Sequence, residues 1–217
     1  PDYLENGWIY LAYSHKLPGN QGKKRPPSMT RIVRGKLHNH SWSNQQVIYQ
    51  APENSYSETR HHYGCRIVFD PDGFLHFGIG DRGRMNQAQD LTLPNGKIHR
   101  ILPSGTIPKS NPFYNNKNAL CTIYTYGNRN PQGLSVHPVT GKVWETEHGP
   151  MGGDELNLII PSQNYGWPVI SYGMDYNGSI ITDLEEKEGM IQPILYWKPS
   201  IAVCGIEFYR GKMFKLW

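Results

Sequence analysis

The chain has 217 residues, of which 37% are hydrophobic and 18% charged, a composition typical of a globular domain that buries a sizeable core. The net charge of +4 comes from residues scattered along the sequence, and there is neither a basic stripe interleaved with aromatic residues nor a known nucleic-acid-binding module. We therefore expect no nucleic-acid partner, and no membrane span either, because no apolar run approaches the roughly 18 residues that a spanning helix requires.

The first element predicted along the chain is a strand after Gly7, and the pattern that predicts it occurs four times. Each time a Gly-containing turn is followed by a short run of apolar and aromatic residues. The four segments are 6–11, 72–77, 140–145 and 210–214. Their glycines, Gly7, Gly73, Gly141 and Gly211, are 66, 68 and 70 residues apart. In the middle two a strand also precedes the turn, at 67–69 and 134–136, which predicts two β-hairpins.

Self-similarity at a fixed period, short strands, and the presence of 23 Gly and 17 Pro favour an all-β fold. We predict a single β-propeller domain over residues 1–217, with a β-sandwich as the structural alternative. Repeats of about 67 residues provide only three to four blades, fewer than most closed propellers contain, so we expect a domain truncated at both ends. The best helix candidate, 183–190, lacks an apolar stripe and is predicted to be a loop.

Two local motifs suggest sites that their surroundings do not support. Residues 78–83 read Gly-Ile-Gly-Asp-Arg-Gly, but a dinucleotide site needs a helix beginning there, and Pro94 and Gly96 leave room for about one turn. The Asp-Pro-Asp-Gly sequence at 70–73 lacks the remaining ligands of a calcium loop and is interpreted as a turn. The three cysteines follow no CxxC spacing and are expected to be buried free thiols. They are Cys65, Cys121 and Cys204.

The segment from Tyr126 to Pro168 concentrates Arg, Asn, Glu, His and Asp in turn-rich sequence around one short strand. Its sharpest part is EHGPMGGDE, at Glu147–Glu155, where three acidic residues flank a Gly-Pro step whose carbonyls have no regular ladder to join. Calcium prefers such oxygen ligands. The residues alone leave two interpretations open, a site for a cation and an anionic organic ligand or a tight surface loop with solvated acids.

Ordered motifs along the whole chain resemble those of the soluble PQQ-dependent sugar dehydrogenases, the glucose/sorbosone or aldose sugar dehydrogenase family. The motifs are GWIYLAYS, HYGCRIVFDPDG, GIGDRG, AQDL, GKIHRI, IPKSNPF, YGNRNPQGL, EHGPMGGDELN, NYGWP and WKPSIAVCGIEFY. The resemblance implies a six-bladed propeller of which this chain is the central part. It implies oxidation of aldose sugars to lactones with PQQ and Ca²⁺ as cofactors and an external electron acceptor, in the periplasm or secreted, with a homodimer as a candidate assembly.

The resemblance places the catalytic base at His62. An imidazole that titrates near neutrality suits the removal of a hydroxyl proton while hydride leaves the same carbon. Asp81 matches the family's Asp partner and would orient this imidazole. Two alternatives remain: His61 is the base if the register slips by one residue, and Asp81 is a turn residue that caps its own backbone.

The resemblance also implies contacts to the quinone from Arg129, Asn130 and Tyr176. A guanidinium beside the quinone oxygens would stabilise the negative charge that develops as hydride arrives. The alternatives are a structural ion pair for Arg129 and core packing for Tyr176.

Two calcium sites complete the set that the resemblance implies. The catalytic ion would bind the carbonyls of Gly149 and Pro150, and a structural ion would bind Glu155 and the carbonyl of Tyr165. The family's upstream Gln and its downstream Lys and Arg contacts have no counterpart here. The alternative function is a non-enzymatic propeller that binds a protein or glycan partner, against which the intact set of polar residues argues.

Overall fold

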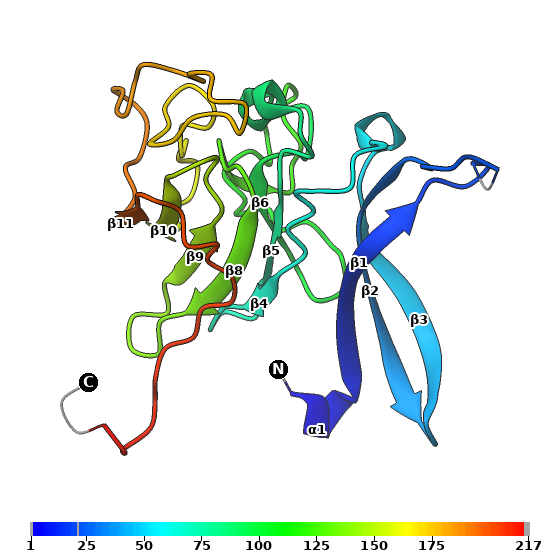
Figure 1. Ribbon diagram of the computed structural model, residues 1–217. Helices are drawn as coiled ribbons and strands as arrows, with labels where there is room; N and C mark the ends of the chain where they lie inside the picture. The colour runs from blue at the N-terminus through cyan, green and yellow to red at the C-terminus, as the bar shows by residue number, and fades with distance from the viewer. Residues whose placement is uncertain (1, 21, 215–217) are drawn as a thin grey trace.

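The computed structural model describes residues 2–20 and 22–214, which form short antiparallel strands and little helix (Figure 1). The strands are β1 (Trp8–Lys16), β2 (Ser28–His38), β3 (Ser41–Gln50), β4 (Ile67–Phe69), β5 (Leu75–Ile79), β6 (Lys97–Ile101), β7 (Ile123–Tyr126), β8 (Pro131–Val136), β9 (Val143–Glu147), β10 (Asp154–Leu158) and β11 (Leu195–Trp197). The helices are α1 (Tyr3–Asn6) and the 3-10 turns η1 (Glu53–Ser55) and η2 (Met85–Gln89). In this part of the chain no helix is both long and apolar enough to span a bilayer.

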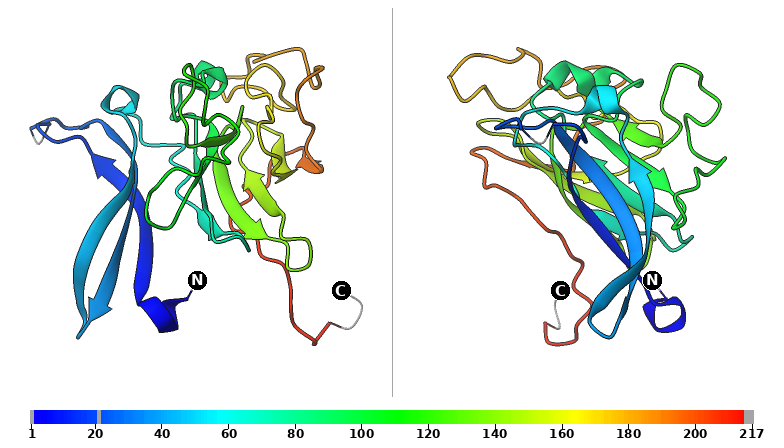
Figure 2. Two further views of the ribbon diagram at one scale, coloured as in Figure 1. Left: turned by 180° about the vertical axis from the view of Figure 1, so that it is seen from behind. Right: turned by 90° about the vertical axis from the view of Figure 1, so that its right-hand side faces the viewer.

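The strands form three sheets, with the orders β1-β2-β3, β4-β5-β6-β7 and β11-β10-β9-β8. Each sheet is a meander in which chain neighbours pair antiparallel, the arrangement of a propeller blade. The second and third sheets lie side by side, because β8 packs against β4 and β5. The views in Figure 2 show that η1, η2 and the long loops before β11 gather at one end of the molecule, opposite α1.

Both predicted hairpins are present. Ile67 pairs with Phe77 across the β4–β5 turn, and Val136 pairs with Val143 across the β8–β9 turn. The turn glycine Gly73 has a φ of 82°, a conformation that few other residues adopt without strain. Segment 183–190 is a loop, as predicted.

The fourth predicted strand, at 210–214, is wrong, because the described residues after β11 form no strand. A strand needs a hydrogen-bonded neighbour, and β11 is the last strand of its sheet. The prediction for the cysteines was partly wrong. All three are free thiols as expected, but none is fully buried, since Cys65 and Cys121 are half-buried and Cys204 is exposed.

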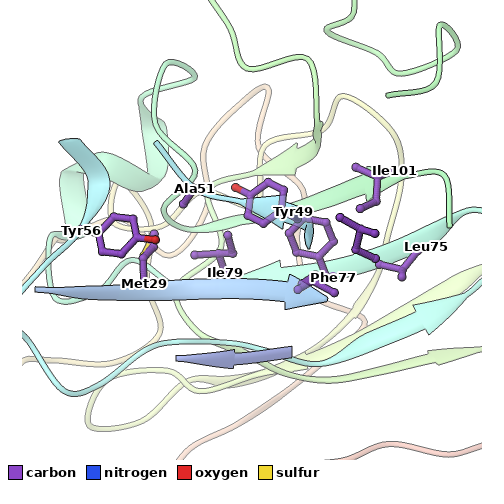
Figure 3. Close-up of a cluster of buried hydrophobic side chains, with 10 residues drawn as sticks. Met29, Tyr49, Ala51, Tyr56, Leu75, Phe77, Ile79 and Ile101 are labelled. Carbon is purple, nitrogen blue, oxygen red and sulfur yellow. The ribbon is translucent and has the colours of Figure 1, made fainter. Parts of the chain in front are cut away.

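Two apolar clusters hold the sheets together. Between the first and second sheets, Tyr49 and Phe77 have ring centroids 4.5 Å apart in a cluster that includes Met29, Leu75 and Ile101 (Figure 3). A second cluster joins the second and third sheets through Ile98, Leu134, Val143, Ile159 and Tyr165. Each fully buried apolar side chain of this size contributes about 1.5–3 kcal/mol. The packing fixes the relative positions of the strand ends, and with them the loops of the site.

Candidate active site

The antiparallel order of the strands brings residues from distant parts of the sequence to one end of the sheets. His62 precedes β4, Asp81 follows β5, Arg129 lies between β7 and β8, and Pro150 follows β9. These positions surround a cavity of about 430 Å³, within the size range of small-molecule sites. The lining residues are His61, His62, Asp81, Gly83, Met85, Arg129, Pro150, Trp167, Asp175, Tyr176 and Ile181.

His62 and Asp81 form a hydrogen-bonded pair in this cavity. The Nδ1 atom of His62 lies 2.6 Å from Oδ1 of Asp81, whose side chain is almost completely buried. Burial alone would raise the pKa of Asp81, but hydrogen bonds donated by His62, the Gly83 amide and the indole of Trp167 outweigh it and hold this pKa below its ordinary value. Asp81 is therefore a carboxylate that accepts a hydrogen from Nδ1, which leaves Nε2 of His62 free to accept a proton.

The geometry distinguishes between the alternative roles of Asp81, His61 and His62. Asp81 does cap its own turn, since Oδ1 accepts from the Gly83 amide at 2.8 Å, and it holds His62 at the same time. The ring of His61 lies edge-on to that of His62, with centroids 4.6 Å apart, and also lines the cavity. Burial and the neighbouring His62 lower the pKa of His61. It is His62 that contacts Asp81.

Gly80 permits the close approach of these loops, a role for which the GxGxxG match at 78–83 was the only sequence signal. A Cβ atom at Gly80 would lie 2.5 Å from the carbonyl oxygen of His62 and 2.9 Å from Oδ1 of Asn130. His62 itself has a φ of 56°, in the left-handed region that non-glycine residues rarely occupy. Such strain persists only where surrounding contacts enforce it, and it is common at functional sites.

The guanidinium of Arg129 is buried at the cavity wall without a carboxylate partner among the described residues. Its Nη1 donates to the carbonyl of His148 at 3.0 Å, and its Nε has no hydrogen-bond partner in the described part of the chain. The expected alternative of a structural ion pair is therefore not what the structure contains. A buried guanidinium that is not ion-paired is costly, so this site favours an anionic ligand.

Asn130 and Tyr176 differ in their position relative to the cavity. Asn130 is buried behind the wall, where its Oδ1 accepts from Nε2 of Gln132 at 3.0 Å, and it is not among the residues that line the cavity. Tyr176 lines the cavity and is 70% exposed, so it is not a packed core residue.

Glu147 holds the loop that carries Arg129, a role that sequence reasoning missed. Its Oε2 accepts hydrogen bonds from the backbone amides of Arg129 and Asn130. Burial raises the pKa of Glu147 to about 7, although these two amides partly oppose the shift. The position of Glu147 in the EHGP motif was the only sequence signal for this role.

The four residues expected at calcium sites line a second, smaller cavity of about 20 Å³ beside the first, enough for one water-sized group. They are Gly149, Pro150, Glu155 and Tyr165. Arg129 and Trp167 line both cavities. Among residues 2–20 and 22–214, no group of three His, Cys, Asp or Glu side chains is arranged to hold a metal ion. A calcium ion here would therefore depend on main-chain carbonyls, which the Gly-Pro step offers.

The small cavity adjoins a buried cluster of carboxylates. Glu145, Glu147 and Glu155 share one donor, Nδ2 of Asn157, at 3.1, 3.4 and 3.1 Å. Burial and the charge of Glu147 raise the pKa of Glu155 to about 8. Oε1 of Glu145 is buried with no partner in the described part of the chain. Glu147 also accepts from the amides of Arg129 and Asn130, so Glu145 is the member of this cluster that keeps an unpaired carboxyl oxygen among the described residues.

The chain is similar to proteins named as sugar dehydrogenases. It is 37% identical to aldose sugar dehydrogenase YliI of Escherichia coli over 222 residues, which cover 100% of this chain and 57% of that protein. The structure of the soluble aldose sugar dehydrogenase from Escherichia coli in the apo-form superposes with a TM-score of 0.91 at 34% identity, covering 100% of this chain and 61% of that one.

A third similar structure is of a protein with bound PQQ. The PQQ-bound form of an aldose sugar dehydrogenase from Streptomyces coelicolor matches with a TM-score of 0.69 at 28% identity, covering 91% of this chain and 51% of that one. The chain spans about half the length of the curated relatives that it matches.

These likenesses confirm the predicted all-β propeller architecture, of which the three sheets are part. The glucose/sorbosone dehydrogenase family description matches residues 1–217. The chain therefore belongs to the glucose/sorbosone dehydrogenase family.

Proposed function

We propose that this chain supplies the central part of the active site of an enzyme that oxidises aldose sugars to lactones with PQQ and calcium. The observation that carries the proposal is the cavity in which the His62–Asp81 pair faces the buried guanidinium of Arg129. A binding surface for a protein or glycan would need neither a carboxylate buried beneath a histidine nor an unpaired buried arginine. The enzymatic role explains both.

The residues present fit an anionic cofactor. The guanidinium of Arg129 has no carboxylate partner in the described part of the chain, and its Nε is buried and unpaired. An anionic ligand in the cavity would satisfy both deficits. Gly149 and Pro150, whose main-chain carbonyls are suitable calcium ligands, line the adjoining cavity. We assign Arg129, Asn130 and Tyr176 to the binding of PQQ, where Asn130 acts by supporting the loop that carries Arg129. We assign Glu155 and Tyr165 to a structural calcium.

The reaction removes a hydride from C1 of the sugar and a proton from its C1 hydroxyl. PQQ supplies a two-electron acceptor for the hydride when it is bound. Nε2 of His62 accepts the hydroxyl proton, and Asp81, a buried carboxylate, stabilises the imidazolium that results. Arg129 stabilises the negative charge that develops on the acceptor side of the cavity. Repeated turnover would need an external electron acceptor.

Steady-state turnover tests the proposal in the protein that contains this chain, reconstituted with PQQ and Ca²⁺. Reduction of an artificial dye should depend on an aldose, and His62→Ala should lower kcat about 10²–10⁴-fold, the usual contribution of a general base. His38→Ala, a matched change at an exposed histidine, should leave the rate unchanged. Absence of aldose-dependent dye reduction by the wild-type protein would refute the proposal.

A further inference from the structure

Trp167 contacts both of the groups to which the proposed function assigns chemistry, and this inference rests on that function. Its indole Nε1 donates to Oδ2 of Asp81 at 2.8 Å. The centre of its ring system lies 5.2 Å from Cζ of the Arg129 guanidinium, within the range of a cation–π interaction. One side chain thus joins the partner of the base to the cation of the cavity wall.

The hydrogen bond from Trp167 complements the bonds that Asp81 already receives. Oδ1 accepts from Nδ1 of His62 and from the Gly83 amide, whereas Oδ2 accepts from Trp167. With both oxygens engaged, the plane of the carboxylate is fixed. The indole is 6% exposed, so water cannot readily replace it as the donor.

The backbone of Trp167 is held as firmly as its side chain. Its amide donates to the carbonyl of Gly127 at 2.8 Å, and its carbonyl accepts from Nε2 of Gln89 at 2.7 Å. Gln89 also exchanges two side-chain hydrogen bonds with Asn164, at 3.0 and 2.8 Å. The indole is therefore presented from a rigid support that connects η2 with the loop before β8.

We propose that Trp167 is a positioning residue for the proton-accepting pair. Its N–H fixes the Asp81 carboxylate so that Oδ1 points at Nδ1 of His62, and this fixes the direction in which Nε2 faces the substrate. Its ring holds the Arg129 guanidinium in the wall of the same cavity. A misplacement of about 1 Å in such a pair lowers a rate strongly.

The first test removes the indole N–H and keeps the shape of the ring. Replacement of Trp167 by β-(3-benzothienyl)alanine, in the protein loaded with PQQ and Ca²⁺, should lower kcat about 10-fold and change the KM for the sugar by less than about twofold. Trp167→Phe should lower kcat at least as much. Trp144 provides the matched control, because its indole nitrogen is buried with no hydrogen-bond partner among the described residues. The same replacement there should change neither parameter.

The second test needs no cofactor and no activity. In ¹H–¹⁵N spectra of the cofactor-free protein, Asp81→Asn should move the Nε1–H resonance of Trp167 upfield, because its acceptor loses its charge, and leave that of Trp144 in place. An unmoved Trp167 resonance would overturn the contact.

The two tests separate failure of this inference from failure of the proposed function. If the wild-type protein oxidises sugar and the benzothienyl variant has the same kcat, the positioning role is wrong while the function stands. If the wild-type protein oxidises no sugar, the positioning role falls with the function, and the resonance shift then reports only whether the hydrogen bond exists.

Discussion

The backbone amide of Asp81 donates a hydrogen bond to the carbonyl of Arg129 at 2.8 Å. This bond joins the loop after β5 to the loop between β7 and β8, which connects the second sheet to the third. The residue that orients His62 and the residue that carries the cationic group of the cavity are therefore held in one frame. A shift of either loop would disturb both, which makes the site sensitive to changes in its supports.

Asp81→Asn should lower kcat about 10²–10⁴-fold while the fold is kept. The amide is nearly the same size as the carboxylate but carries no charge to stabilise a protonated His62. The measurement is sugar-dependent dye reduction, with circular dichroism to establish folding. Asp72→Asn, at the exposed β4–β5 turn, serves as the control. A folded Asp81→Asn protein with the wild-type kcat would contradict the role of this pair.

Arg129→Ala should weaken PQQ binding by about 10-fold or more, because it removes a buried guanidinium that forms no ion pair with a carboxylate of the described residues. Absorbance titration of the cofactor-free protein with PQQ measures this affinity. Arg25→Ala, at an exposed position, should leave the affinity unchanged. Equal affinities of wild type and Arg129→Ala would show that the quinone binds elsewhere.

Gly80→Ala should reduce activity and destabilise the fold by about 1–3 kcal/mol, because its Cβ would collide with the carbonyl of His62 and with Asn130. Urea denaturation and dye reduction measure the two effects. Gly22→Ala has open space around the added methyl group and should be neutral in both assays. A Gly80→Ala protein as stable and active as wild type would mean that these loops are free to separate.

Lys97 should make stability depend on pH, because burial lowers its pKa to about 7 from 10.5. Between these two values the unfolded chain binds more protons than the folded one, so the free energy of unfolding should rise with pH across this window. Below pH 7 both states hold the proton, so the dependence on pH disappears and the cost of burying the charged amine is fully present. The free energy of unfolding of the wild type minus that of Lys97→Met, both measured by urea denaturation, should therefore rise from pH 7 to pH 10. A constant difference would contradict the assignment.

Calcium should stabilise the protein, and Glu155→Gln should weaken this effect. An ion that binds only the folded state raises the melting temperature by mass action. The measurement is the melting temperature in excess Ca²⁺ and after chelation. Glu188→Gln, at an exposed loop position, should retain the full shift. If Glu155→Gln also retains it, the structural ion does not use this carboxylate.

The Gly-turn repeat was enough to predict the hairpins at Gly73 and Gly141, because local turn chemistry fixes them. It did not reveal the longer strands β2 and β3, whose pairing depends on contacts across the sheet. The repeat also failed after Gly211, where turn chemistry is present but no neighbouring strand is available among the described residues. Local signals specify a hairpin only when a partner exists.

The residues of the candidate site also fall into those that were predicted and those that were not. His62, Asp81, Arg129 and Tyr176 were placed together by the resemblance, and the structure brings them to one cavity. Trp167, Glu147 and Gly80 were not assigned roles, because their functions depend on distances between loops that no sequence spacing encodes. They support the residues that carry the chemistry rather than carrying it themselves.

The most direct test of the proposed function is a single-turnover measurement of PQQ reduction by an aldose, without an external acceptor. We predict a rapid change in the absorbance of the bound quinone in the wild-type protein. The rate of this change should be about 10²–10⁴-fold lower in His62→Ala. No aldose-dependent absorbance change in the wild-type protein, or the same rate in both proteins, would contradict it.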